Sequence, residues 1–379
     1  LAAIEVERER IDKQLPTTLV CRELPQPKPA FILKRGEYDQ KGPSVTRATP
    51  AFLPPSPPDA PPDRLGLARW LLGPEHPLTA RVAVNRFWQQ CFGTGLVKTA
   101  EDFGTQGEPP SHPELLDWLA VEFRENGWDV KALMRQIVLS AAYRQSSRVT
   151  PEALAKDPEN RLLARGPRFR LDAEALRDQA LAVGGLLVEK QGGPGVKPPQ
   201  PPGLWEAVGY LTSNTRNFTA DTGPEKVHRR SLYTFWKRTA PPPQMTVLDA
   251  PSREACRVRR ERTDTPLQAL MLMNETQYVE SARALAERAM KAGGATPADR
   301  LAWMFRAATC RRPDAKEAAE LLAAYRDLLT KYSGDADAAA KLIAVGESKA
   351  DGALPPVELA AYTMVANLIL NMNEVLTKG

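Results

Sequence analysis

Apolar residues recur every three to four positions along most of the chain after residue 62, which is the period of an amphipathic helix. In the first half, this spacing predicts helices over residues 63–72, 79–91, 111–126, 130–143 and 172–189. In the second half, it predicts helices over residues 265–291, 296–310, 313–332, 335–345 and 355–376. We therefore expect a mainly α protein, a multi-helical body with a few short strands.

Proline and glycine mark where this helical pattern is interrupted. Residues 16–62 contain twelve prolines, which predicts an extended N-terminal arm because proline fixes φ and lacks a backbone donor. Within the arm, the apolar residues 31–33 followed by Gly36 predict a short strand that enters a turn. Glycines and prolines in 192–202 predict a loop, and the apolar and aromatic positions of 231–236 predict another strand.

These interruptions divide the chain into four expected segments. They are a Pro-rich arm and connector from a preceding domain (1–62), an N-terminal helical subdomain (63–190), a Pro/Arg-rich irregular segment with short strands (191–264) and a C-terminal helical bundle (265–379). The chain does not begin with Met, so we expect a piece of a longer protein. The most apolar stretch, 357–370, contains Glu358 and Asn367 and is shorter than the roughly 20 residues of a membrane span, which predicts a buried core helix.

Positive charge is concentrated in one part of the chain. The net charge is +5, but residues 225–262 alone hold ten Lys/Arg and four Asp/Glu, which gives +6 and leaves −1 for the remainder. A local basic patch favours binding of phosphate, sulfate or carboxylate groups. It lacks the length and the interleaved aromatic residues of a nucleic-acid surface, so no nucleic-acid partner is expected.

Arginine side chains of this patch are candidates for ligand binding because their planar forks hold oxyanions through two parallel hydrogen bonds. The candidate ligand-binding residues are Asn85, Arg86, Arg229, Arg230, Arg253, Glu254, Arg259, Arg260, Arg262 and Asp264. The alternative is a network of Arg–Asp and Arg–Glu pairs that pins the irregular segment onto the helical body, since an unpaired buried charge is costly.

Three further side chains are candidates for catalysis, namely Asp102, His112 and Cys256. Imidazole acts as a general base near neutral pH, and arginines beside a thiol can lower its pKa. In the alternative interpretation, His112 packs at a helix start beside a carboxylate and Cys256 is a small buried group.

Cys21, Cys91, Cys256 and Cys310 form no C-x-x-C pair, which predicts no metal or covalent haem site in this chain. Cys91 and Cys310 lie in apolar helical patterns and are expected to be buried.

Several ordered strings carry a family resemblance. They are Asn-Arg-Phe-Trp at 85–88, Glu-Asp-Phe-Gly at 101–104, Ser-His-Pro-Glu-Leu-Leu-Asp-Trp-Leu at 111–119, Asp-Ala-Pro-Ser-Arg-Glu-Ala-Cys at 249–256 and the run 259–270. From about Asp63 to its end the chain resembles the planctomycete cytochrome-associated domain of unknown function 1553, a PSD-type C-terminal domain. In full-length members this unit follows a cytochrome c-like domain and a second uncharacterised domain.

The resemblance implies a periplasmic or extracellular location and partners within the same protein, with haem c confined to the absent N-terminal domain. It implies no reaction. We expect an accessory or binding module that holds an anionic, sulfated or carboxylated glycan, or a partner domain, through the arginine-rich region. The alternative is a hydrolase or oxidoreductase domain that uses Asp102, His112 and the region from Arg253 to Cys256.

Overall fold

The computed structural model describes residues 2–15, 17–210, 212–213 and 215–379, and the protein is mainly α, as predicted. Its contacts divide the chain into two compact units. The first comprises residues 1–83 and 117–128, and the second comprises residues 84–116 and 129–379. This division cuts the chain differently from the four segments expected along the sequence, whose boundaries stay a prediction.

The first unit contains the Pro-rich arm. A helix, α1 (Ala2–Gln14), precedes an antiparallel pair of strands, β1 (Ala30–Leu33) and β2 (Lys41–Val45), in which Phe31 pairs with Ser44. A 3-10 turn, η1 (Lys34–Gly36), joins them, so the predicted strand and turn are confirmed. The predicted helix at 63–72 is α2 (Arg64–Leu71), which begins where the Asp63 carboxylate accepts a hydrogen bond from the Gly66 amide.

The predicted helices of the next segment are α3 (Thr79–Phe92), α4 (Pro113–Glu125), α5 (Val130–Leu139) and α7 (Ala173–Gly184). Two of them end earlier than predicted. The Ser140 hydroxyl bonds the Ile137 carbonyl oxygen and the Tyr143 amide, which competes with continuation of α5. Gly185 adopts φ of 80° and caps α7, so the helix stops before Glu189.

The predicted long helix over 265–291 is two helices, α10 (Pro266–Asn274) and α11 (Thr276–Ala292). Glu275 between them has an extended backbone, and its carboxylate accepts the Gln277 and Tyr278 amides at 2.8 and 3.2 Å. The carboxylate therefore starts a new helix within an unbroken apolar period. The stretch 355–376 likewise divides into α15 (Pro356–Leu370) and α16 (Asn373–Leu376).

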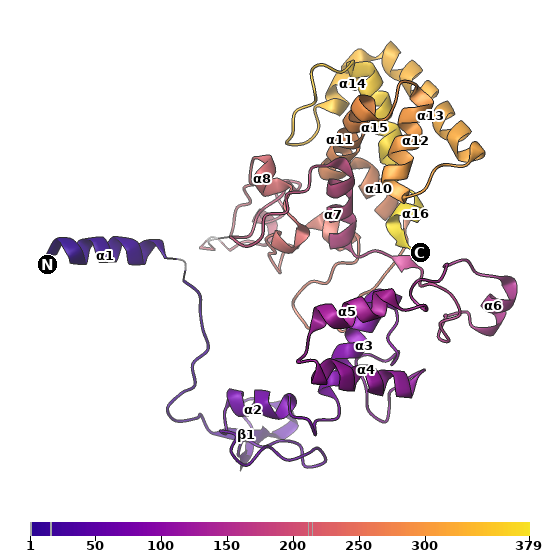
Figure 1. Ribbon diagram of the computed structural model, residues 1–379. Helices are drawn as coiled ribbons and strands as arrows, with labels where there is room; N and C mark the ends of the chain where they lie inside the picture. Colours follow the sequence, from indigo (N-terminus) through magenta and orange to yellow (C-terminus); the bar gives the residue numbers. More distant parts are fainter. Residues whose placement is uncertain (1, 16, 211, 214) are drawn as a thin grey trace. The chain divides into compact units, whose positions relative to one another are not determined.

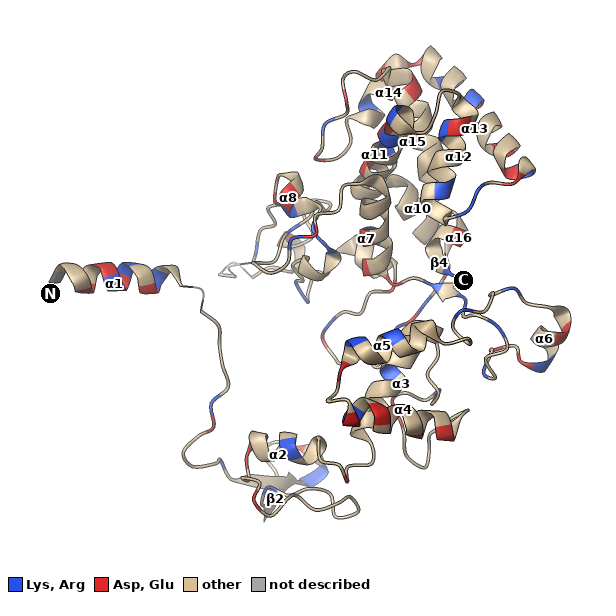
Figure 2. Cartoon of the chain, viewed as in Figure 1, with Lys and Arg blue, Asp and Glu red and all other residues tan. Residues whose placement is uncertain are grey.

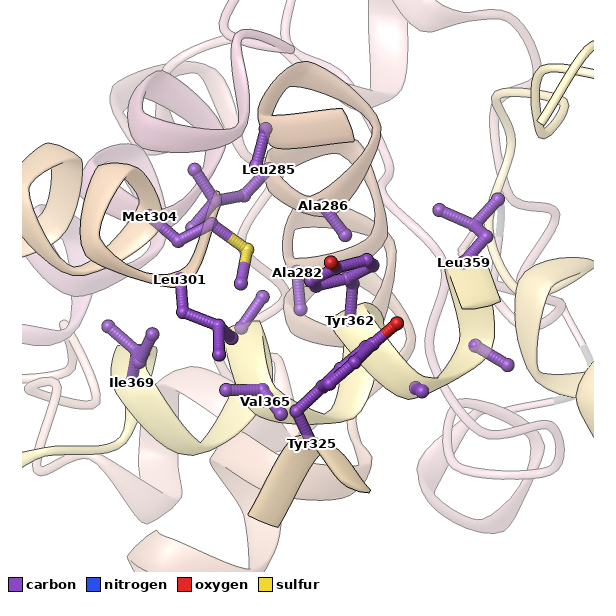
Figure 3. Close-up of a cluster of buried hydrophobic side chains, with 14 of the residues drawn as sticks. Ala282, Leu285, Ala286, Leu301, Met304, Tyr325, Leu359, Tyr362, Val365 and Ile369 are labelled. Carbon is purple, nitrogen blue, oxygen red and sulfur yellow. The ribbon is translucent and has the colours of Figure 1, made fainter. Parts of the chain in front are cut away.

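The hydrophobic core of the C-terminal half is built around α15 (Figures 1 and 3). Helices α11, α12 (Pro297–Thr309), α13 (Ala315–Gly334) and α14 (Ala336–Ile343) pack against it. Leu359, Tyr362, Val365 and Ile369 of α15 are fully buried, which confirms the prediction of a core helix. Within the described residues, no helix combines the length and apolar character that a membrane crossing requires.

Short elements occupy the irregular segment: η2 (Glu206–Val208), α8 (Pro224–Val227), η3 (Ser231–Tyr233) and α9 (Pro243–Val247). Another short helix, α6 (Pro151–Lys156), lies between α5 and α7. The predicted strand over 231–236 is wrong, because η3 occupies its start and only Thr234 forms an isolated bridge, with Val196. A pair of two-residue strands was not predicted: β3 (Phe169–Arg170) pairs antiparallel with β4 (Thr377–Lys378).

All four cysteines are free. Cys91 is buried, as expected, and burial raises the pKa of its thiol. Cys310 is exposed, which corrects the expectation for that residue: α12 ends at Thr309, and Cys310 adopts a left-handed φ of 62° outside the apolar stripe.

Candidate functional site

A pocket of about 540 Å³ opens in the second unit between the turn after α3 and the loop from α6 to β3. Five basic side chains and one acidic side chain line it, so its charge is strongly positive. They are Lys98, Arg161, Arg165, Arg168, Arg262 and Glu159. We call it the basic pocket. The loop around α6 carries several of these basic residues (Figure 2).

The turn after α3 is fixed by contacts that only small residues allow. Gly93 has φ of 83°, and a Cβ there would lie 2.8 Å from the Phe169 ring. A Cβ on Gly95 would lie 2.5 Å from the Asn85 amide nitrogen. That amide is fully buried and exchanges two hydrogen bonds with the backbone of Val97, at 3.0 and 2.9 Å. Asn85, a predicted ligand residue, therefore shapes this turn.

The opposite wall is the loop from Asp157 to Arg168. The Asp157 carboxylate accepts the amides of Arg161 and Leu162, each at 2.7 Å. The Arg161 guanidinium reaches across and donates to the carbonyl oxygens of Gly95 and Leu96, at 2.7 and 2.8 Å. One arginine thus joins two walls of the pocket that are far apart in sequence.

The cations of the basic pocket are only partly neutralised. Lys98 bonds the Glu159 carboxylate at 2.8 and 3.0 Å, and these bonds lower the pKa of Glu159. Arg165 instead donates to the carbonyl oxygens of Asp157 and Pro158, which are neutral acceptors. Arg168 is exposed and has no hydrogen bond or ion pair from its side chain within the described part of the chain.

Arg262 is the one predicted ligand residue that lines the basic pocket. Its guanidinium lies 4.4 Å from the centre of the Phe169 ring, donates to the Gly93 carbonyl oxygen at 3.3 Å and approaches Asp172 at 3.5 Å. The aromatic face and the carbonyl oxygen hold the group at the pocket wall, so its orientation is set before any ligand arrives.

Most of the other predicted arginines are engaged elsewhere in the chain. Arg229 is buried, donates to the carbonyl oxygens of Lys190, Gly192 and Pro194, and stacks 3.6 Å from the Tyr233 ring centre. Its contacts tie the loop before η2 to the segment around η3. Arg229 thus holds the irregular segment through carbonyl oxygens, whereas the alternative interpretation expected Asp and Glu partners.

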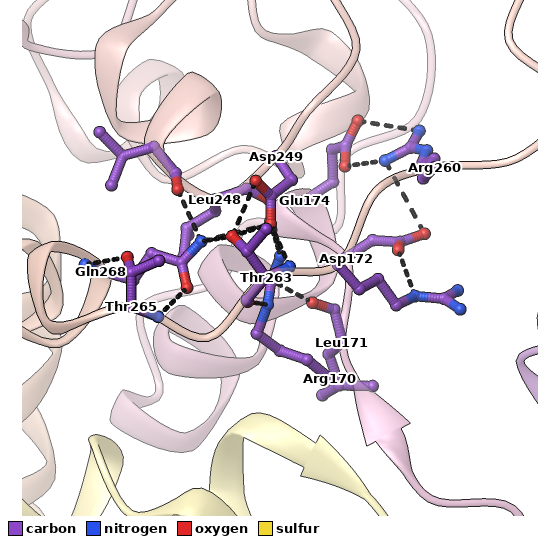
Figure 4. A network of polar contacts seen from close by, with 12 residues as sticks. Arg170, Leu171, Asp172, Glu174, Leu248, Asp249, Arg260, Thr263, Thr265 and Gln268 are labelled. Atoms are coloured by element: carbon purple, nitrogen blue, oxygen red, sulfur yellow. Dashed lines mark hydrogen bonds and ion pairs between the residues drawn. The ribbon is translucent and has the colours of Figure 1, made fainter.

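Arg260 forms two hydrogen bonds with Glu174, at 2.6 and 3.2 Å (Figure 4). Burial raises the pKa of Glu174, but the bonds from Arg260 outweigh that effect and the net pKa is lowered. Arg253 lies over the Trp236 ring and 4.0 Å from Glu174. Arg230 and Arg259 are exposed and form ion pairs: Arg230 lies 3.4 Å from Asp178, and Arg259 lies 3.7 Å from Glu101.

Asp249 is the centre of a second polar network (Figure 4). Its carboxylate accepts hydrogen bonds from Arg170 at 2.5 Å, from the Thr263 amide and hydroxyl, and from Gln268 at 3.2 Å. Burial raises the pKa of Asp249, while the bonds from Thr263 and Arg170 lower it, and the net pKa is lowered. The network fixes residues 249–268 against β3.

The remaining predicted residues are separate from one another. The Asp102 carboxylate accepts the Gly104 amide at 2.7 Å, and the His112 ring contacts the Ser111 hydroxyl at 3.0 Å. Cys256, Arg86, Glu254 and Asp264 are exposed. No hydrogen bond or ion pair joins Asp102, His112 and Cys256 to each other within the described residues, and no metal-binding group of His, Cys, Asp and Glu occurs there.

Arg161, Arg165 and Arg168 were missed by the reasoning from sequence. Their signal was present, because residues 161–170 contain four arginines and no acid. Residues 225–262 form a longer stretch with more cations. Several of those cations are already used inside the fold.

A family model described as PSD1, protein of unknown function (DUF1553), matches residues 63–325. Comparison with curated proteins finds no match. Comparison with solved structures also finds none.

Proposed function

We propose that this chain, which belongs to the DUF1553 family of proteins of unknown function, is a binding module for an anionic glycan. The proposal rests on the basic pocket. The observation that carries this proposal is the excess of cations in the lining, where Lys98, Arg161, Arg165, Arg168 and Arg262 face one carboxylate, Glu159. The volume of about 540 Å³ lies within the range of small-molecule sites.

The choice of a sulfated or carboxylated sugar rests on the rest of the lining. Ser111, Ser147, Thr94 and Asn160 add hydroxyl and amide groups, which suit a polyhydroxylated ligand. Trp88, Phe92 and Phe169 add aromatic surface against which a sugar ring can pack. Guanidinium groups then hold the oxyanion through paired hydrogen bonds.

We also propose, from the family resemblance of its sequence motifs, that this module is the accessory C-terminal part of a planctomycete envelope protein. Its partners would be the preceding cytochrome c-like domain and a second domain of the same protein. The glycan would then be met in the periplasm or outside the cell. Haem chemistry would belong to the preceding domain.

The test is a calorimetric titration of the protein with a heparin-derived tetrasaccharide at low salt and at physiological ionic strength. We expect saturable binding that weakens as salt rises, because salt screens exposed charges. Arg168→Gln should weaken the affinity by about tenfold, the value of one lost charge-assisted contact. Arg168 has no intramolecular partner in the described chain, so this change leaves the fold intact.

Arg238→Gln is the matched control, since Arg238 is an exposed arginine of the segment 225–262 and does not line the basic pocket. Its affinity should equal that of the unmodified protein. The proposal is wrong if the tetrasaccharide does not bind at low salt. It is also wrong if the double variant Arg165→Gln/Arg168→Gln binds normally while Arg238→Gln does not.

A further inference from the structure

A second, smaller pocket of about 190 Å³ lies beside α10 and the junction of α15 with α16. Its polar lining residues are Arg170, Asp264, Gln268, Asn371, Asn373 and Thr377. Leu176, Leu248 and Leu272 close its apolar side. We call it the acceptor pocket.

Two donors in its lining, the Arg170 guanidinium and the Gln268 amide, are already used. Arg170 gives its hydrogen bonds to the carbonyl oxygens of Thr263, Leu171 and Leu248 and to the Asp249 carboxylate. The Gln268 amide nitrogen likewise donates to the Val247 carbonyl oxygen at 2.9 Å and to the Thr263 hydroxyl at 2.8 Å. A guanidinium has five N–H groups in a fixed fork, and this one is directed into the protein.

Three acceptors of the lining, by contrast, have capacity for a further hydrogen bond. Asn371 donates through its amide nitrogen to the Ala269 carbonyl oxygen at 3.1 Å, but its Oδ1 is buried and has no hydrogen-bond partner in the described chain. The Thr377 hydroxyl donates to the Asn373 carbonyl oxygen, which leaves its own lone pairs open. Asp264 is exposed and forms no hydrogen bond or ion pair within the described residues.

The charge balance points in the same direction. The positive charge of Arg170 is matched by Asp249, at 2.5 Å. The carboxylate of Asp264 is left without a counter-charge in the lining. A buried acceptor such as Asn371 Oδ1 normally has a donor, and a ligand can supply it. The pocket therefore suits a guest that carries N–H donors and a positive charge.

We propose that the acceptor pocket binds a small molecule with a primary ammonium group. The ammonium group is attracted by the Asp264 carboxylate and donates a hydrogen bond to Asn371 Oδ1. Its volume limits the guest to a few heavy atoms, since one water takes about 30 Å³ of liquid volume. This site is opposite in charge preference to the basic pocket and does not depend on the glycan proposal. Failure of either proposal leaves the other standing.

The experiment is ligand-observed saturation-transfer NMR with ethanolamine, propylamine and putrescine, each titrated against the whole chain. Ethylene glycol and glycolate serve as neutral and anionic probes of similar size. We expect saturable signals from the amines, no competition by glycolate and weak or no signal from ethylene glycol. Asp264→Asn should weaken amine binding by about fivefold or more, because it removes the charge and keeps the shape.

Asp327→Asn is the matched control, an exposed carboxylate on α13 that lacks a partner in the described chain. It should bind the amines as the unmodified protein does. Absence of saturable binding by all three amines overturns the proposal. So does equal binding by Asp264→Asn, or binding of ethylene glycol as tight as that of ethanolamine, since either result shows that positive charge is not recognised.

Discussion

The C-terminal helices and the irregular segment 191–264 are held together by different forces. Around α15 the contacts are apolar: Tyr362 stacks on Tyr325, with ring centres 4.3 Å apart, and Phe305 and Met304 are fully buried. The irregular segment is instead held in place by hydrogen bonds from buried arginines. Arg177 of α7 is buried and donates to the carbonyl oxygens of Val227 and Arg229 and to Gln277.

This difference shows that arginines in an irregular segment can have a structural role. A segment without helical hydrogen bonds leaves many carbonyl oxygens unpaired, and each one that is buried needs a donor. Arginine supplies up to five donors from a single side chain. Much of the positive charge in 225–262 is therefore a means of building an irregular structure, and fewer of its cations remain for a ligand.

The largest effect is expected where the apolar core is broken. Phe305→Ala should lower the free energy of unfolding by about 3–5 kcal/mol, since it removes a buried ring and leaves a cavity. Urea denaturation followed by circular dichroism measures it. Leu267→Ala is the control, because Leu267 is 60% exposed, and should change stability by less than about 0.5 kcal/mol. Similar losses in the two variants would contradict the core assigned here.

A smaller effect is expected where an arginine holds the irregular segment. Arg229→Lys should lower the free energy of unfolding by about 1–3 kcal/mol, because one ammonium cannot replace a fork that reaches three carbonyl oxygens. Hydrogen exchange at residues 190–195 should become faster. The neighbouring Arg230→Lys, at an exposed position, should change neither quantity. Equal exchange in both variants would show that Arg229 does not hold this loop.

The smallest effect concerns the Asp249 network and its dependence on pH. Asp249→Asn should lower the free energy of unfolding at neutral pH by about 1–2 kcal/mol. The folded pKa of Asp249 is lowered, so its contribution is complete above the ordinary pKa of about 3.9 and is lost as the pH falls through the folded value. The difference between variant and unmodified protein should therefore shrink towards acid pH.

Urea denaturation between pH 7 and pH 3 makes this comparison. Asp327→Asn, in which an exposed carboxylate is neutralised, should show a small difference at every pH. A difference for Asp249→Asn that stays constant down to pH 3 would mean that the negative charge of Asp249 contributes nothing to stability.

Helix starts were predictable because their chemistry is local. Asp63, Asp129 and Thr296 each accept a hydrogen bond from the backbone amide three residues later, and side chains of these types are common at helix starts. The break at Glu275 was not predictable from periodicity, since the apolar pattern continues through it. The glutamate caps α11 only because the chain turns there.

The candidate site was less predictable than the fold, because its walls come from distant parts of the chain. Spacing cannot show that Arg161 reaches Gly95, 66 residues away. Asn85 and Arg86 are neighbouring residues that were both predicted to bind a ligand. The Asn85 side-chain amide instead forms two hydrogen bonds with the Val97 backbone. Whether an arginine is free depends on which carbonyl oxygens surround it, and those positions are set by tertiary structure.

The bonds of Arg161 to the Gly95 and Leu96 carbonyl oxygens have a kinetic consequence. A long side chain loses about 2 kcal/mol of rotamer entropy when it is immobilised, and here folding has already removed that freedom. Its charge remains, because a carbonyl oxygen accepts a hydrogen bond without neutralising the cation. An anion bound as we propose would meet the Arg161 guanidinium already in place, so this side chain would add no rearrangement to the rate of capture.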